Sequence, residues 1–167
     1  MARRPPHMDP ARQPDGDGKQ RPSPTTPFRW RLTASDESDP ARVVWALRER
    51  IKELNCLYAI AQLAEAGDGP IEEVLEVVVN IIPPSWQYPE ITCARITFLD
   101  GTYKSPGFRL TAWQQSATIH FYGESAGEVT VCYLEERPAS FEGPFLHEER
   151  VLLDAIAERV GAIAMRI

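Results

Sequence analysis

Apolar residues recur at helical spacing in three stretches of the chain. The first runs from Val43 to about Glu65 without Gly or Pro, after Asp39 as N-cap and Pro40 at the first helical position. Its apolar positions step by four and three, the heptad spacing of a helical seam: Leu47, Ile51, Leu54, Tyr58 and Ala61. A second stripe lies on an adjacent face: Cys56, Ile60 and Leu63. We expect one stripe to pack on the domain's own sheet and the other to meet a second copy of the helix.

Two further stretches predict helices. Residues 71–82 have helical apolar spacing, follow the breaker sequence 67–70 and stop at Pro83 and Pro84. The closing stretch, from about 144 to 167, has apolar residues at similar steps: Leu152, Ile156, Val160, Ile163 and Ile167. We expect the first and last helices to lie side by side across the sheet with their seams turned outward. The predicted dimer seam comprises Leu47, Ile51, Leu54, Tyr58, Leu152, Ile156, Val160 and Ile163.

The middle of the chain has the pattern of β-strands. Residues 91–98 are rich in β-branched side chains, and Asp100 and Gly101 predict a tight hairpin into a short return strand. Residues 114–122 alternate between apolar and polar, and a turn at 123–127 leads to a strand at 128–134. Such short connections require antiparallel pairing. The predicted fold is therefore α+β: an antiparallel sheet of about four to five strands, covered on one face by the N- and C-terminal helices.

The chain of 167 residues has room for one domain, which we assign to residues 40–167. Residues 1–39 hold seven of the 15 prolines and few apolar side chains, which predicts a disordered Pro-rich tail. One part of this tail differs: three apolar residues alternate with two arginines, as Phe28, Arg29, Trp30, Arg31 and Leu32. This pattern suits a short edge strand or a docking segment, and stray aromatics in a linker are the alternative.

Charge and hydropathy exclude several classes of protein. The net charge is −6, and residues 41–167 hold 18 of the 24 acidic side chains but 11 of the 18 basic ones. An acidic domain offers few cations for phosphate, so we expect no nucleic-acid partner. No run of about 18 apolar residues occurs, and the basic N-terminus lacks the apolar core of a signal peptide. We expect no membrane insertion and a cytoplasmic location.

The alternation of the strands predicts a polar sheet face on which a ligand could bind. The candidate ligand-binding residues are Arg95, Thr118, His120 and Thr130, with Trp86 from the segment 86–89 as a lid. Arg95 would anchor a small anion or a partner strand. A solvated antiparallel face is the alternative, and core packing is the alternative for Trp86.

Cys93 and Cys132 would lie on the same face and could sense oxidants. Buried thiols acting as small apolar residues are the alternative. The three cysteines form no CxxC pair, the three histidines share no ligand spacing, and phosphate- and dinucleotide-binding motifs are missing. We therefore expect no metal and no cofactor.

Four blocks of the sequence recur in order: residues 49–60, 82–96, 131–136, and 142–146 with 148–150. They resemble the GAF-like sensory domain that precedes the kinase module of microbial sensor histidine kinases. The resemblance covers about residues 42–167 and implies a GAF-like form of the predicted α+β fold. It implies a non-catalytic signal-input or regulatory domain of two-component signalling, with a homodimer and a kinase or other signalling protein as partners. In that family the closing helix runs on into an output module, whereas this chain ends at Ile167, so we expect no kinase activity. The free methionine sulfoxide reductases are a thiol-enzyme branch of the fold and remain an alternative, although none of their motifs is present.

Overall fold

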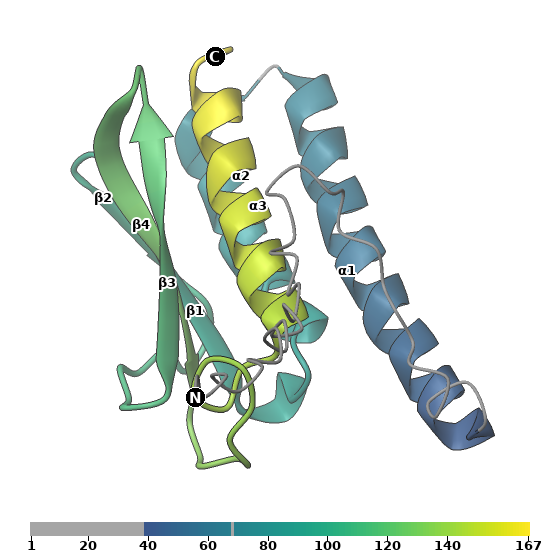
Figure 1. Cartoon of the computed structure of the whole chain (residues 1–167). Helices are drawn as coiled ribbons and strands as arrows, with labels where there is room; N and C mark the ends of the chain where they lie inside the picture. Colours follow the sequence, from purple (N-terminus) through teal and green to yellow (C-terminus); the bar gives the residue numbers. More distant parts are fainter. Residues whose placement is uncertain (1–38, 68) are drawn as a thin grey trace, which may run out of the picture.

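The computed structural model describes residues 39–67 and 69–167. The predicted tail, including the alternating segment 28–32, lies outside these residues apart from Asp39. The described chain contains three α-helices and four strands in an α+β arrangement (Figure 1). Their bounds are α1 Pro40–Ala66, α2 Ile71–Ile81, β1 Thr92–Phe98, β2 Gly101–Lys104, β3 Gln114–Phe121, β4 Glu124–Tyr133 and α3 His147–Ala164, with short 3₁₀ turns at Pro83–Ser85 and Pro89–Ile91.

Helix α1 begins and ends where the sequence predicts. The Asp39 side chain accepts a hydrogen bond from the Ala41 amide at 3.0 Å, and Pro40 opens the first turn. Gly67 ends the helix in the left-handed region at φ 53°, a conformation that glycine adopts without the Cβ penalty. The 27 residues of α1 make it about 40 Å long.

The four strands form one antiparallel sheet in the order β2-β1-β4-β3, so β2 and β3 are its edges. The hairpin between β3 and β4 turns at Tyr122 and Gly123, both at positive φ. The prediction of a turn at 123–127 was therefore wrong, because β4 already begins at Glu124. Gly127 is a strand residue, and a Cβ there would collide with the carbonyl of Thr97 on β1.

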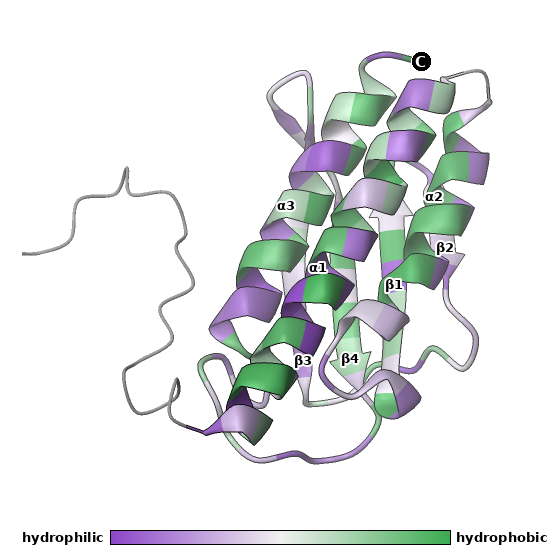
Figure 2. Ribbon diagram, turned by 90° about the vertical axis from the view of Figure 1, so that its right-hand side faces the viewer, coloured by the Kyte–Doolittle hydropathy of each residue, from purple (hydrophilic) through white to green (hydrophobic). Residues whose placement is uncertain are grey.

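The helices form two layers on one face of the sheet. Helices α2 and α3 lie against the strands, and α1 lies over them on the side away from the sheet (Figures 1 and 2). The prediction that the N- and C-terminal helices together cover the sheet was thus wrong for α1, whose place is taken by α2. Helix α2 takes this place because a larger share of its side chains is buried in the core. Four of the 11 residues of α2 are buried, against three of the 27 in α1.

Helix α3 uses its apolar stripe on the core. Leu152, Ile156, Val160 and Ile163 are at most 4% exposed. They face inward, toward the sheet. Helix α3 packs so closely on β3 that a Cβ at Gly161 would collide with the carbonyl of His120. These four residues therefore cannot form the outward seam that the sequence predicted for them. Trp86, Tyr133 and Phe145 are the largest side chains of the core and have no exposed surface.

Candidate functional site

The outward face of α1 carries a continuous apolar stripe. Four of its members are the seam residues predicted for this helix, and the fifth is Val44, one heptad step before Leu47. All five side chains are between 46% and 66% exposed: Val44, Leu47, Ile51, Leu54 and Tyr58. Figure 2 shows apolar positions along α1, which faces the viewer there. Large apolar side chains that gather on one helix face, rather than lying scattered, mark an interaction surface.

The stripe has the composition of a two-stranded coiled-coil seam. Its alternate steps of three and four assign Val44, Ile51 and Tyr58 to heptad position a, and Leu47 and Leu54 to position d. In parallel coiled coils, β-branched residues at a, here Val44 and Ile51, with leucine at d favour two strands. The flanking positions raise no charge conflict in that arrangement, because Arg50 at g would face Asn55 at e of the other helix.

A hydrogen bond and buried apolar side chains hold α1 to the rest of the domain. The Lys52 ammonium donates to the Trp86 carbonyl at 2.8 Å. Within the helix, Lys52 also pairs with Glu49 at 2.7 Å and Arg50 pairs with Glu53 at 3.1 Å. The inward stripe adds Cys56 and Ile60, both buried. The outward stripe is thus presented on a helix whose orientation is fixed by the core.

Glu149 is a buried carboxylate that joins α3, β4 and the turn after α2. It is 4% exposed and accepts hydrogen bonds from the amides of Gln87 at 2.7 Å and Leu146 at 2.8 Å. The Tyr133 hydroxyl lies within 3.2 Å of both carboxylate oxygens. Burial raises the pKa of Glu149 above its ordinary value, and the three hydrogen bonds oppose that rise. Every donor comes from the fold itself, so the group acts as a structural clamp.

The structure brings together only part of the predicted ligand-binding set. Arg95 and Thr130 are direct partners on β1 and β4. Thr118 is paired with Glu128, one row along the sheet, and His120 lies beyond the irregularity at Ile119, opposite Ser125. Thr130 is 2% exposed and donates its hydroxyl proton to Glu128 at 2.8 Å. Arg95 is therefore the predicted binding residue that remains for a ligand on the central strands.

The loop between β2 and β3 covers one end of this polar face. Phe108 lies under the Arg95 guanidinium at 5.4 Å and near the Lys104 ammonium at 5.9 Å. The Cys93 thiol contacts the Arg109 carbonyl at 3.7 Å. The Nε of Arg95 is buried and has no hydrogen-bond partner among the described residues.

Trp86 and the thiols are not accessible. Trp86 is fully buried, so its predicted role as a lid over a ligand was wrong; it packs in the core beneath α1. Cys93 and Cys132 are direct cross-strand partners and are at most 1% exposed. Both are free thiols, and burial raises the pKa of Cys132. Thiols that solvent cannot reach are poor nucleophiles, which favours a packing role for both cysteines.

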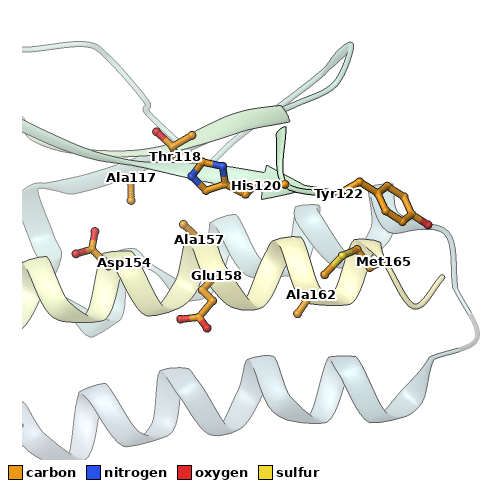
Figure 3. Close-up of a pocket in the computed structure, with 10 residues that line it drawn as sticks. Ala117, Thr118, His120, Tyr122, Asp154, Ala157, Glu158, Ala162 and Met165 are labelled. Atoms are coloured by element: carbon orange, nitrogen blue, oxygen red, sulfur yellow. The ribbon is translucent and has the colours of Figure 1, made fainter. Parts of the chain in front are cut away.

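A groove that the sequence did not predict lies between the edge strand β3 and helix α3. Its volume is about 520 Å³, and Figure 3 shows its lining from the two elements. The strand contributes Thr118 and His120, and the helix contributes small side chains and two acids: Ala157, Ala162, Asp154 and Glu158. The two elements are 26 residues apart in sequence, so the groove arises from packing and not from a local motif.

Among the residues 39–67 and 69–167, no group of three or more His, Cys, Asp or Glu side chains could hold a metal ion. No helix in the same part of the chain is long and apolar enough to cross a membrane. No family model, curated protein or solved structure matches this chain significantly.

Proposed function

We propose that this chain is a non-catalytic, GAF-like signal-input or regulatory domain that pairs with a second copy of itself through helix α1. The observation that carries the proposal is the half-exposed heptad stripe from Val44 to Tyr58. Domains of the kind seen before histidine kinase modules are connected through their terminal helices. A paired α1 would give this domain such a connection, with a kinase or another signalling protein of the cytoplasm as the output partner.

A second copy of α1 would bury the stripe. Full burial of an exposed apolar side chain of this size gains about 1.5–3 kcal/mol, and these five side chains, which are already about half buried, would gain correspondingly less. The stripe covers little more than two heptads, so the gain is modest and the pair should be reversible. A reversible pair suits a regulatory role, because a ligand or partner that favours one state can shift the population.

Sedimentation velocity of the full chain tests this proposal. The double variant Ile51→Glu and Leu54→Glu should shift the protein toward monomer, since it places two charges in each seam. The matched control is Leu110→Glu, which alters a 52% exposed leucine far from α1 in sequence. Equal sedimentation of wild type and both variants at every concentration would refute the pairing.

A second candidate function is an anion receptor on the polar sheet face. It is favoured by the Arg95 Nε, which is buried without a hydrogen-bond partner in the described chain. Inorganic phosphate should then raise the melting temperature of the wild type but not of Arg95→Met. If phosphate stabilises both proteins equally, Arg95 is not the anchor.

A further inference from the structure

Strand β3 is an edge strand with few of the features that keep native edges from pairing with another strand. It has eight residues, and none of them is Lys, Arg, Asp, Glu or Pro. Native edges are usually blunted by charges, proline or shortness. The other edge, β2, has only four residues and ends at Lys104. Strand β3 is therefore the edge of this sheet that can accept one more strand.

The open part of this edge is centred on Thr118. The Trp113 carbonyl accepts from an amide of β4, so odd-numbered residues of β3 turn their backbone groups toward β4 and even-numbered residues turn theirs outward. The Ser116 carbonyl accepts from the Arg150 guanidinium of α3 at 2.8 Å, which closes one end of the edge. A register shift directly after Ile119 ends the regular ladder at the other end. Between these two points, the amide and carbonyl of Thr118 face outward.

The groove beside Thr118 is acidic. Asp154 and Glu158 of α3 line it, and none of its described lining residues is Lys or Arg. Arg150, at the closed end of the edge, is neutralised by Glu142 and by Asp154 at 2.9 Å. Glu158 has no ion-pair partner among the described residues. The groove therefore holds negative charge with which a cationic side chain can pair.

The two carboxylates of the groove are spaced to meet alternate residues of a strand. They are four residues apart in α3, about 6 Å along the helix axis, and alternate residues of a strand are about 6.8 Å apart. Helix α3 runs alongside β3 in the same direction, because its first turn contacts Ser116 and its last turn packs on His120 at Gly161. Figure 3 shows Ala117 on the side of β3 that faces α3, with Asp154 beneath it. A strand added to β3 therefore directs every second side chain toward these acids.

We infer that the β3 edge binds an extended segment of a partner protein that carries Lys or Arg at every second position. The backbone of this segment pairs with the amide and carbonyl of Thr118. The aliphatic stems of its cationic side chains pack over Ala157 and Ala162, and their charged heads pair with Asp154 and Glu158. The residues between the cations lie on the polar face of the sheet. Main-chain bonds along an edge, with alternate side chains in adjacent pockets, are an established mode of peptide recognition.

The charges argue against a second copy of this chain as the occupant of the edge. Strand β3 contains no Lys or Arg, so its copy cannot supply the cations that the groove requires. A symmetric pair of β3 strands would also bring the acidic flanks of two α3 helices together. Charge complementarity therefore assigns the edge to a basic segment of another protein.

Fluorescence anisotropy of labelled synthetic peptides, titrated with the full chain, tests the inference. The probe has the sequence Thr-Lys-Val-Lys-Val-Lys-Thr, and the matched control has the same residues in blocks, Lys-Lys-Lys-Val-Val-Thr-Thr. The alternating peptide should bind at least about tenfold more tightly, because only its cations all lie on the groove side of a strand. Equal affinity of the two peptides would mean that an acidic domain attracts any cation, and would overturn the inference.

Variants of the edge and of the groove locate the binding. Thr118→Pro removes the outward amide without removing a bond to β4 and should weaken binding of the alternating peptide about tenfold. Glu158→Gln removes one of the two carboxylates and should weaken it about threefold. The matched controls are Thr118→Ala and Glu76→Gln, the latter at an exposed position of α2, and both should bind as the wild type does. Thermal unfolding establishes that each variant is folded, and Ala162→Arg, which fills the groove, replaces Thr118→Pro if that variant unfolds.

Two further results would overturn the inference. One is undiminished binding by the folded edge and groove variants, which would place the peptide elsewhere on the domain. The other is hydrogen exchange of the Thr118 amide that slows with protein concentration in the absence of peptide, which would assign the edge to a second copy. The α1 double variant Ile51→Glu and Leu54→Glu should keep the preference for the alternating peptide, so this test is independent of α1 pairing.

Discussion

The hydroxyl of Tyr133 on β4 lies 3.1 and 3.2 Å from the two carboxylate oxygens of Glu149 on α3. This contact, with the amides of Gln87 and Leu146, ties the sheet, the closing helix and the turn beneath α1 at one point. Burial raises the pKa values of both side chains, because each is taken from water into the core. The contact therefore links the stability of the domain to pH.

The sign of that pH dependence follows from the raised pKa of Glu149. Folding favours the protonated carboxyl, so its contribution to stability is full below its ordinary value of about 4.5 and is lost as pH rises through the folded pKa. Relative to Glu149→Gln, whose side chain does not titrate, the wild type should lose unfolding free energy over that range. Urea denaturation from pH 4 to 8 measures the difference, and a difference that grows with pH would contradict this prediction.

Tyr133→Phe should destabilise the domain by about 2 kcal/mol, because it removes a donor from a buried carboxylate. The loss should be larger at pH 8 than at pH 4, since the ionised carboxylate needs the donor more. Tyr58→Phe is the control, as its hydroxyl is on the exposed face of α1 and contacts only Gln62 among the described residues. Equal effects of the two variants on chemical denaturation would refute the role of Tyr133.

Gln115 should be replaceable with a gain in stability. It is 3% exposed, and neither its Oε1 nor its Nε2 has a hydrogen-bond partner in the described chain. Gln115→Met removes that desolvated amide at similar volume and should stabilise by about 1–2 kcal/mol. Gln114→Met, at the exposed neighbouring position, should change the unfolding free energy by less than about 0.5 kcal/mol. A destabilised Gln115→Met would mean that the amide is satisfied in solution.

Gly161→Ala should destabilise the domain even though alanine is the better helix former. The added Cβ would meet the His120 carbonyl, and the separation of α3 from β3 would cost about 1–3 kcal/mol. At exposed Ala162, the opposite change to glycine should cost about 0.5–1 kcal/mol through helix propensity alone. Thermal unfolding compares the two, and a stabilised Gly161→Ala would refute the close packing.

The elements that depend on local signals were predictable from the sequence. Asp39 and Gly67 mark the ends of α1, and strand alternation identified which face of the sheet is polar. The predicted position of the turn between β3 and β4 was wrong because glycine is typical of turns and Gly127 was assigned to one. Its real constraint is the Thr97 carbonyl of another strand, which no local pattern contains.

The candidate sites divide in the same way. Heptad spacing predicted a stripe on both terminal helices, but periodicity does not say what covers a stripe. The α3 stripe is buried against β3, whereas the α1 stripe is exposed, because α2 occupies the place on the sheet that α1 was expected to take. The β3–α3 groove has no sequence signal, since it exists only once the helix packs on the strand.

Cysteine crosslinking of α1 tests the central claim most directly. Val44→Cys and Tyr58→Cys place a thiol near opposite ends of the stripe, while the three native thiols are buried. In a parallel, in-register pair, each variant alone should form a disulfide-linked dimer under mild oxidation, and the wild type should not. An antiparallel pair would crosslink efficiently only when the two variants are mixed, and this would contradict the parallel seam. The absence of any covalent dimer, in both variants and in their mixture, would contradict pairing through α1 altogether.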